Sequence, residues 1–149
     1  MKEIIVEMDT RNQKDSYVTK YFDKHGIKWI RNKLYTGDVK LLNSTKVIID
    51  LKKNLEELCG NICSVQHQRL VREIERSREI GCEDFIFLIK DSKIKKPQDI
   101  INWSSKHTKV KGDTLYKALK TFKEHHNVRY VFCNSKNAGA IIIKLLTND

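Results

Sequence analysis

The chain has 149 residues, 40% of them hydrophobic, and a formal net charge of +10 from 29 Lys and Arg against 19 Asp and Glu. This length supports one domain, 1–149, with little room for a second, and the composition excludes a disordered chain. No run approaches the roughly 20 apolar residues that cross a bilayer, which excludes a membrane-spanning protein. The first residues resemble a strand and not a signal peptide, so a soluble, cytoplasmic protein is expected.

The basic charge favours a polyanionic partner, and phosphate backbones are the commonest of these. The four cysteines form no Cys-x-x-Cys pair, so reduced thiols are expected. A zinc site remains an alternative, because Cys59, Cys63 and His67 follow one another at four-residue steps, with Cys82 as a fourth ligand. Burial of the cysteines as ordinary core residues is the competing interpretation.

The first half of the chain is predicted to form one helix and four strands. A strand over 3–9 delivers Asp9 to its end, a helix follows over 15–25, and Gly26 closes it. Strands are then predicted over 27–34, 39–42 and 46–49, the last two paired antiparallel across a turn at 43–45. Residues 53–58 are expected to be a connection with a helical turn.

The second half alternates helices with strands. The pattern predicts a helix over 64–80 closed by Gly81, a central strand over 85–89, and a short helix from Pro97 to Trp103. A basic loop over 106–111, an amphipathic helix over 114–125, a strand over 128–133 and a helix over 138–146 follow. This order predicts an α/β fold with a central mixed β-sheet flanked by helices.

One group of polar residues is expected where the two antiparallel strands meet. Asp50 and Lys52 project from the same face because strand side chains alternate, and the pairing brings Asp38 close to Asp50. Two carboxylates and an ammonium in one small site suit a divalent metal and a nucleophilic water. The competing interpretation is a turn aspartate beside a strand-end ion pair of less than ~1 kcal/mol.

With these residues placed, the chain resembles the nuclease domain of XPF-type structure-selective endonucleases, within the restriction-endonuclease-like group that carries an Asp/Glu-x-Lys signature. That pattern has a strand ending in Val-Asp-x-Arg-Glu, a Gly-Asp turn, and a strand ending in Glu-Arg-Lys. The matching segments follow the family's order and cover nearly the whole chain: Met8-Asp9-Thr10-Arg11-Asn12, Gly37-Asp38, Asp50-Leu51-Lys52, Arg69-Leu70, the apolar strand 85–89 and the closing 113–147.

The resemblance implies a restriction-endonuclease-like core and a metal-dependent endonuclease acting on branched or flapped DNA, in the manner of a junction resolvase. Mg²⁺ or Mn²⁺ would be held by Asp38, Asp50 and the backbone carbonyl of Leu51, with Asp9 nearby as a further acid. Lys52 would orient or help deprotonate the attacking water. The catalytic set implied is therefore Asp9, Asp38, Asp50 and Lys52.

DNA contacts are expected from basic residues that bring affinity and salt dependence without reading bases. These are Arg11, Arg69, Arg72, Arg76, Lys106, Lys109 and Lys111. Two alternatives stay open for them: the three helix arginines are equally a solvated face paired with Glu73, and Arg11 is equally an ion-pair partner of Asp9.

Three departures from the family pattern are visible. Asn12 stands where the family has glutamate, Asp50 is one methylene shorter than the usual glutamate, and Leu51 replaces an arginine. The family's helix-hairpin-helix module has no room after Asp149, so DNA affinity is expected from this domain, from a partner or from dimerisation. A homodimer is expected because the apolar run 140–146 exceeds what one helix face needs; complete burial of that helix in the monomer is the alternative.

Two other functions compete with this one. The same family includes partner subunits that keep the fold and lose the acids, so a non-catalytic DNA-binding subunit is one alternative. A restriction-like nuclease that acts on plain duplex or on RNA is the other.

Overall fold

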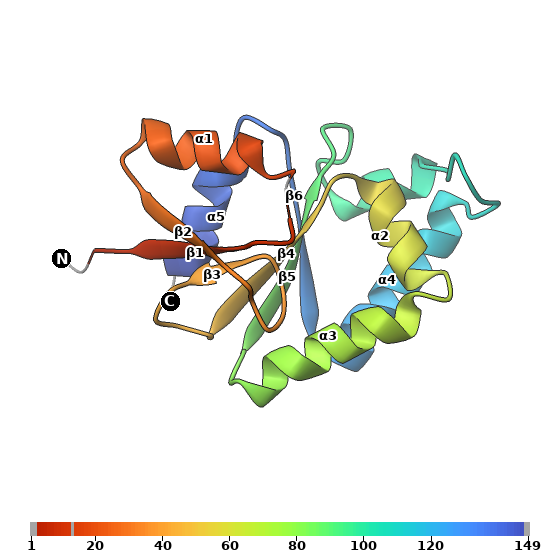
Figure 1. The fold of residues 1–149 in the computed structure, drawn as a ribbon. Helices are drawn as coiled ribbons and strands as arrows, with labels where there is room; N and C mark the ends of the chain where they lie inside the picture. Colours follow the sequence, from red (N-terminus) through yellow and green to blue (C-terminus); the bar gives the residue numbers. More distant parts are fainter. Residues whose placement is uncertain (1–2, 13, 148–149) are drawn as a thin grey trace.

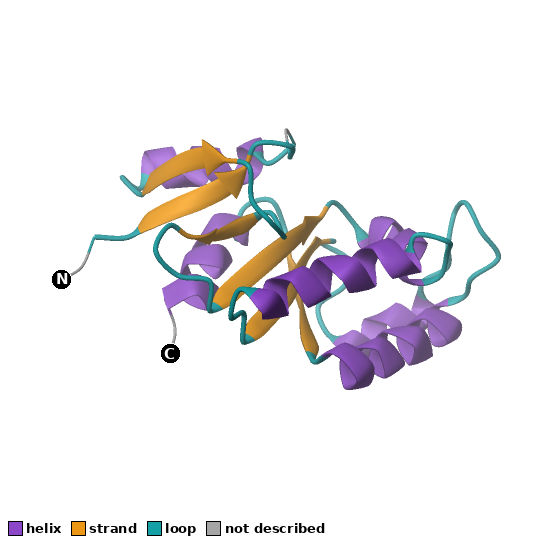
Figure 2. Ribbon diagram, turned by 60° about the horizontal axis from the view of Figure 1, so that its bottom comes forward, coloured by secondary structure: helices purple, strands orange, loops and turns teal. Residues whose placement is uncertain are grey.

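The computed structural model describes residues 3–12 and 14–147, which form a six-stranded mixed sheet between two groups of helices (Figures 1 and 2). The elements follow in the order β1 (Ile5–Asp9), α1 (Ser16–Lys24), β2 (Lys28–Asn32), β3 (Val39–Leu41), β4 (Val47–Lys52), α2 (Leu55–Ile62), α3 (His67–Glu79), β5 (Asp84–Lys90), the 3-10 helix η1 (Pro97–Asn102), α4 (Gly112–His126), β6 (Val128–Cys133) and α5 (Ala138–Thr147). The predicted α/β fold with a flanked mixed sheet is therefore confirmed.

The strands lie in the order β2-β1-β3-β4-β5-β6. β3 pairs antiparallel with both of its neighbours, while the remaining neighbours pair parallel, so β3 alone runs against the other five strands of this sheet. The carboxyl ends of β1, β4 and β5 consequently meet at one edge, together with the beginning of β3. In sheets of this kind ligands bind outside the carboxyl ends of the strands.

Each face of the sheet has its own apolar core. The side chains of Ile48, Phe85 and Phe87 pack under α2, α3 and α4. The alternate residues of the same strands, such as Ile49 and Ile86, pack under α1 and α5. Figure 1 shows these two helix groups on opposite sides of the sheet. Both Ile48 and Ile49 are fully buried, as expected for a strand covered on both faces.

The segment after β4 differs from the prediction. Residues 53–58 are predicted to be a connection with a helical turn, but the structure has a full helix there, α2 from Leu55 to Ile62, and the next helix begins only at His67. Asn54 caps α2 by accepting a hydrogen bond from the backbone N–H of Glu57 (2.9 Å), which satisfies one of the free donors of the first turn. Because Gly60 lies inside this helix, local propensity gives only a weak helical signal.

The apolar run at the C-terminus is accounted for within the chain. α5 packs on α1 and β4, and its residues Ile141, Ile143 and Leu145 are partly buried against that core. The large hydrophobic side chains that are exposed in the described residues lie elsewhere. Homodimerisation therefore stays a prediction. In the described part of the chain, no helix combines the length and the apolar character needed to span a membrane.

Candidate active site

Three acidic residues lie in register on the neighbouring strands β1, β3 and β4. Met8 pairs with Val39, and Val39 pairs with Ile49. The next row of paired positions across the three strands is therefore Asp9, Asp38 and Asp50. Neighbouring residues of one row share a face, and this is the face that α3 covers. The expected antiparallel pairing is confirmed, and the register places Asp38 directly opposite Asp50.

Main-chain contacts fix the position of Asp38. Its backbone N–H donates to Ile49 O (2.9 Å), and its Oδ2 accepts a hydrogen bond from the backbone N–H of Leu51 (2.7 Å). Gly37 precedes it with a φ of +74°, and a β carbon there would overlap Cγ2 of Ile48. Glycine adopts this left-handed conformation at no steric cost, so Gly37 lets the chain turn tightly into β3.

Asp50 and Lys52 form the buried end of the site. Only 4% of Asp50 and 8% of Lys52 are exposed, and Lys52 Nζ lies 3.3 Å from Asp50 Oδ2. Despite this ion pair, Asp50 Oδ2 has no hydrogen-bond partner among the described residues. A buried oxygen without such a partner is unusual, because burial removes the water that would otherwise satisfy it.

Burial controls the charge of both carboxyl groups. Burial raises the pKa of Asp50 to about 8, a rise that Lys52 opposes and Asp38 adds to. Burial also raises the pKa of Asp38, and this outweighs the lowering effect of its hydrogen bonds to Asp50 and Leu51. Without a metal, the pair therefore keeps a proton near neutral pH, because two adjacent carboxylates with little solvent do not both ionise.

Lys52 keeps its charge. Burial by itself would lower the pKa of Lys52, but Asp50, Glu57 and Glu73 raise it above its ordinary value. The side chain is therefore an ammonium at neutral pH and has no lone pair with which to take a proton from water. Its role in this site is that of a fixed positive charge.

The carboxylate of Asp9 is engaged by other groups. It accepts hydrogen bonds from Arg11 Nε (3.0 Å) and from the backbone N–H of Leu34 (3.0 Å). The ion-pair interpretation of Arg11 is thus what the structure shows, and its Nη2 also donates to Leu34 O (2.7 Å). Asn12 accepts from the backbone N–H of Lys14 (3.1 Å) through its side chain. Asp9 is in the expected row, but its oxygens hold the neighbouring loop.

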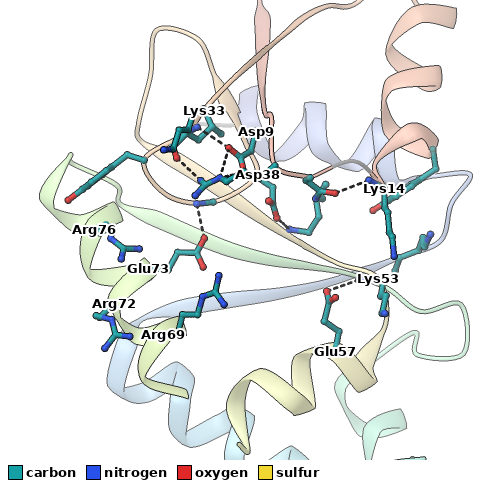
Figure 3. A pocket seen from close by; sticks show the side chains of 18 residues that line it. Asp9, Lys14, Lys33, Asp38, Lys53, Glu57, Arg69, Arg72, Glu73 and Arg76 are labelled. Atoms are coloured by element: carbon teal, nitrogen blue, oxygen red, sulfur yellow. Dashed lines mark hydrogen bonds and ion pairs between the residues drawn. The ribbon is translucent and has the colours of Figure 1, made fainter. Parts of the chain in front are cut away.

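A cavity of about 1010 Å³ opens above this row of acids, between the sheet edge and α3 (Figure 3). Its acidic lining includes Asp9, Asp38 and Glu73, whereas Asp50 and Lys52 lie behind its surface. Glu57 is a further acid of the lining, and the basic residues outnumber the acids there: Arg11, Lys14, Lys33, Lys53, Arg69, Arg72, Arg76 and Lys90. In Figure 3 the three α3 arginines form one wall, and Lys14 and Lys53 lie on the other side.

The structure divides the basic residues that the sequence singled out. Arg11 and the three α3 arginines line the cavity, and their contact with DNA stays a prediction. Lys106, Lys109 and Lys111 are exposed in the connection between η1 and α4 and do not line it. Instead, lysines 14, 33, 53 and 90 complete the lining. They come from four separate loops and strand ends, so no single stretch of sequence groups them.

Glu73 is a further site residue that the sequence did not assign. Its Oε1 accepts a hydrogen bond from Gly37 N–H (3.0 Å), and its main-chain oxygen accepts one from Thr36 Oγ1 (2.6 Å). Burial and the nearby Asp50 raise the pKa of Glu73. The sequence could have indicated that Glu73 faces inward, because it lies four residues before Ser77 and one before Ile74, both of which are buried on the inner side of α3.

The donor set at Asp38 and Asp50 suits a magnesium-type ion better than zinc. It consists of oxygens, one of them buried without a hydrogen-bond partner, and Mg²⁺ characteristically takes one or two carboxylates and keeps several waters. Across residues 3–12 and 14–147, no three His, Cys, Asp or Glu side chains are arranged to hold a metal by themselves. The alternative zinc site is not formed: Cys59 is buried, Cys63 is exposed, and His67 Nδ1 is engaged with Ile62 O at 2.9 Å.

Comparison with known proteins places the chain in a family. The ERCC4 domain model matches residues 8–146, so the protein belongs to the ERCC4-domain family, the XPF-type nuclease domains. XPF from Aeropyrum pernix has the same fold, with a TM-score of 0.68 and 18% identity over 97% of this chain and 66% of that one. The structure of XPF from Aeropyrum pernix in complex with DNA matches with a TM-score of 0.70 and 18% identity, over 96% of this chain and 63% of that one. No match was found among curated proteins.

Proposed function

We propose that this domain is a metal-dependent DNA endonuclease that hydrolyses phosphodiester bonds in branched or flapped DNA. One observation carries the proposal: a buried Asp50 oxygen, which has no hydrogen-bond partner in the described part of the chain, lies beside Asp38 and the Lys52 ammonium, beneath a basic cavity. The ERCC4-domain family and the XPF fold support it, and one of the XPF structures was solved with DNA. The chain spans about two thirds of those two XPF chains, so their whole-protein activities are not carried over.

The residues that would hold Mg²⁺ or Mn²⁺ are Asp38, Asp50 and the backbone carbonyl of Leu51. The N–H of Leu51 points toward Asp38, and in an extended strand a residue's N–H and C=O point to the same side. When bound, the ion would supply a lowered pKa for a coordinated water and a counter-charge for the phosphate. The proton shared by Asp38 and Asp50 would have to leave when the ion binds.

Lys52 would act as a counter-charge in this mechanism. The acids around it raise the pKa of Lys52 in the metal-free site, and its ammonium would stabilise the negative charge that develops on the phosphate. Such stabilisation is strong in a site with little water, and Lys52 is almost fully buried. Residues Leu34 to Gly37, attached to Asp9 and Glu73, would hold the cavity open above the reacting phosphate.

The basic lining would bind the phosphate backbone. Arg69, Arg72 and Arg76 on α3 face Lys14 and Lys53 across the cavity. Contacts of this kind give affinity that falls with salt and carry no base sequence, which suits recognition of DNA by shape. Arg11 is already held by Asp9 and Leu34, so it would contribute charge more than a free bidentate contact.

A second candidate is a DNA-binding domain without catalysis. It is favoured by the residues at the end of β1. Both Asp9 oxygens accept hydrogen bonds from Arg11, and Asn12 carries an amide where the family has a carboxylate. This leaves two carboxylates, Asp38 and Asp50, in the row to bind an ion directly.

The test is cleavage of three labelled DNAs, a flap, a four-way junction and a plain duplex, with Mg²⁺, with Mn²⁺ and with EDTA. The proposal predicts metal-dependent cutting of the branched substrates, and Asp50→Asn should abolish cutting while DNA binding in EDTA persists. Binding without any cutting by the wild-type chain would favour the second candidate. Equal cutting of the plain duplex would refute the preference for branched DNA. Cutting by Asp50→Asn would refute the assignment of Asp50 to the active site.

A further inference from the structure

Residues 33–37, in the loop that joins β2 to β3, form part of the cavity wall and are fixed at several points. Thr36 Oγ1 donates to Glu73 O (2.6 Å), and Gly37 N–H donates to Glu73 Oε1 (3.0 Å). At its other end, Leu34 N–H donates to Asp9 Oδ1 (3.0 Å). The loop is therefore attached both to α3 and to β1, which fixes the direction in which its central residue points.

That central residue, Tyr35, carries an exposed aromatic ring and is part of the cavity wall. Tyr35 is 55% exposed, lines the cavity, and donates its hydroxyl proton to Glu79 Oε2 at 2.7 Å. Among the described residues the other exposed large hydrophobic side chains are Ile30, Val65 and Ile101, and none of them lines the cavity. Tyr35 thus offers an aromatic surface whose hydroxyl end is tethered while much of the side chain remains open.

An aromatic ring next to several cations suits a nucleotide. The ring stacks on a base of any identity, while Arg76, one turn before Glu79 on α3 and also in the cavity lining, would hold its phosphate. Inside a duplex, both faces of each base are covered by its stacked neighbours. An exposed ring therefore gains this contact from bases that are unpaired or terminal.

The residue that carries the ring lies close to the acids of the site along the chain. Three peptide units separate Tyr35 from Asp38, so their Cα atoms are at most about 11 Å apart. We propose that Tyr35 stacks on an unpaired base near the scissile phosphate and thereby selects DNA that has single-stranded nucleotides at the site. This inference rests on the proposed function, because it uses the same cavity and the same class of substrate.

The simplest competing role for Tyr35 is structural. Its hydroxyl tethers the loop to α3 through Glu79, and loss of the tether alone would disturb Gly37 and Asp38. Two substitutions separate these roles: Tyr35→Phe removes the hydroxyl and keeps the ring, whereas Tyr35→Leu removes both. Stacking requires the two variants to differ, and a tether requires them to behave alike.

The test measures binding in EDTA, so that no cutting occurs, to a flap and to a plain duplex of equal length. Tyr35→Leu should bind the flap about 5- to 100-fold more weakly while changing duplex affinity less than about twofold, the range expected for loss of one stacked base. Tyr35→Phe should stay within about threefold of wild type on both DNAs. A 2-aminopurine base placed in the flap beside the junction should be quenched by wild type and by Tyr35→Phe, but not by Tyr35→Leu.

Equal losses in the two variants, equal losses on flap and duplex, or no quenching at any flap position would overturn the stacking role. These outcomes are distinct from failure of the proposed function. Wild-type cutting with an unaffected Tyr35→Leu refutes stacking alone, whereas the predicted split in binding without any cutting supports stacking and refutes catalysis. Absence of DNA binding by the wild-type chain refutes both.

Discussion

Asp50→Asn should change how the stability of the metal-free protein depends on pH. Burial raises the pKa of Asp50 from its ordinary value of 3.8 to about 8. Between these values the folded chain binds more protons than the unfolded chain, so the free energy of unfolding falls as pH rises. The loss begins near pH 4 and is complete above about pH 8. Asparagine has no proton to lose, so the variant should lack this part of the slope.

The size of the effect follows from the interval between the two values. Each pKa unit corresponds to about 1.4 kcal/mol, so the stability difference between variant and wild type should shift by on the order of 5 kcal/mol between pH 4 and pH 9. For a domain of this size that is about 10–20 °C in Tm. A constant offset is expected as well, because Lys52 loses its nearest partner, but an offset does not alter the slope.

Thermal and urea unfolding in EDTA from pH 4 to pH 9 measure this difference. Glu124→Gln is the matched control, because it removes one carboxylate from an exposed position on α4 and should leave the slope as in wild type. Mg²⁺ should raise the Tm of wild type at pH 8.5 and leave Asp50→Asn unchanged, since the ion replaces the proton of the pair. Parallel pH profiles for wild type and Asp50→Asn would refute the assignment of Asp50 as a buried, proton-binding carboxyl.

Three further predictions concern neighbouring residues. Lys52→Met should reduce cleavage about 10²- to 10³-fold in a single-turnover assay while DNA affinity in EDTA changes less than about threefold; an equal loss of affinity would make Lys52 a binding residue. Gly37→Ala should lower the free energy of unfolding by at least about 2 kcal/mol in urea, because its β carbon meets Ile48 and its φ is positive; an unchanged midpoint would contradict this. Replacing the three α3 arginines with Ala should reduce the steepness with which log affinity for duplex DNA falls with log salt by about 3. Replacing Lys106, Lys109 and Lys111 should leave this steepness nearly unchanged. The opposite result would place the bound DNA on the loop before α4.

Sequence patterns predicted the parts of the fold that depend on local geometry. The turn at 43–45 and strict alternation along two strands fix the register, and this brings Asp38 opposite Asp50. Gly26, at the end of α1, has a φ of +66°, in agreement with its predicted role as a helix terminator. α2 extends beyond the predicted helical turn because Asn54 caps its first turn through the N–H of Glu57, whereas Gly60 weakens the helical pattern in the sequence.

The candidate site was predicted in part. The row of acids follows from strand register, but the engagement of Asp9 by Leu34 depends on a loop whose path no periodicity describes. Lys14, Lys53 and Lys90 meet because three strand ends converge on one edge, a consequence of topology and not of local sequence. Whether Lys52 is charged depends on the balance between burial and acids from three elements, which only the assembled fold defines.

The most direct test of the account is the anomalous difference density of a crystal soaked in Mn²⁺ at pH 8. The account predicts a single strong peak between the carboxylates of Asp38 and Asp50, within coordination distance of the carbonyl oxygen of Leu51, and its loss in Asp50→Asn. A well-ordered cavity without that peak, or a peak bound to other side chains, would contradict a metal-dependent nuclease centred on this pair.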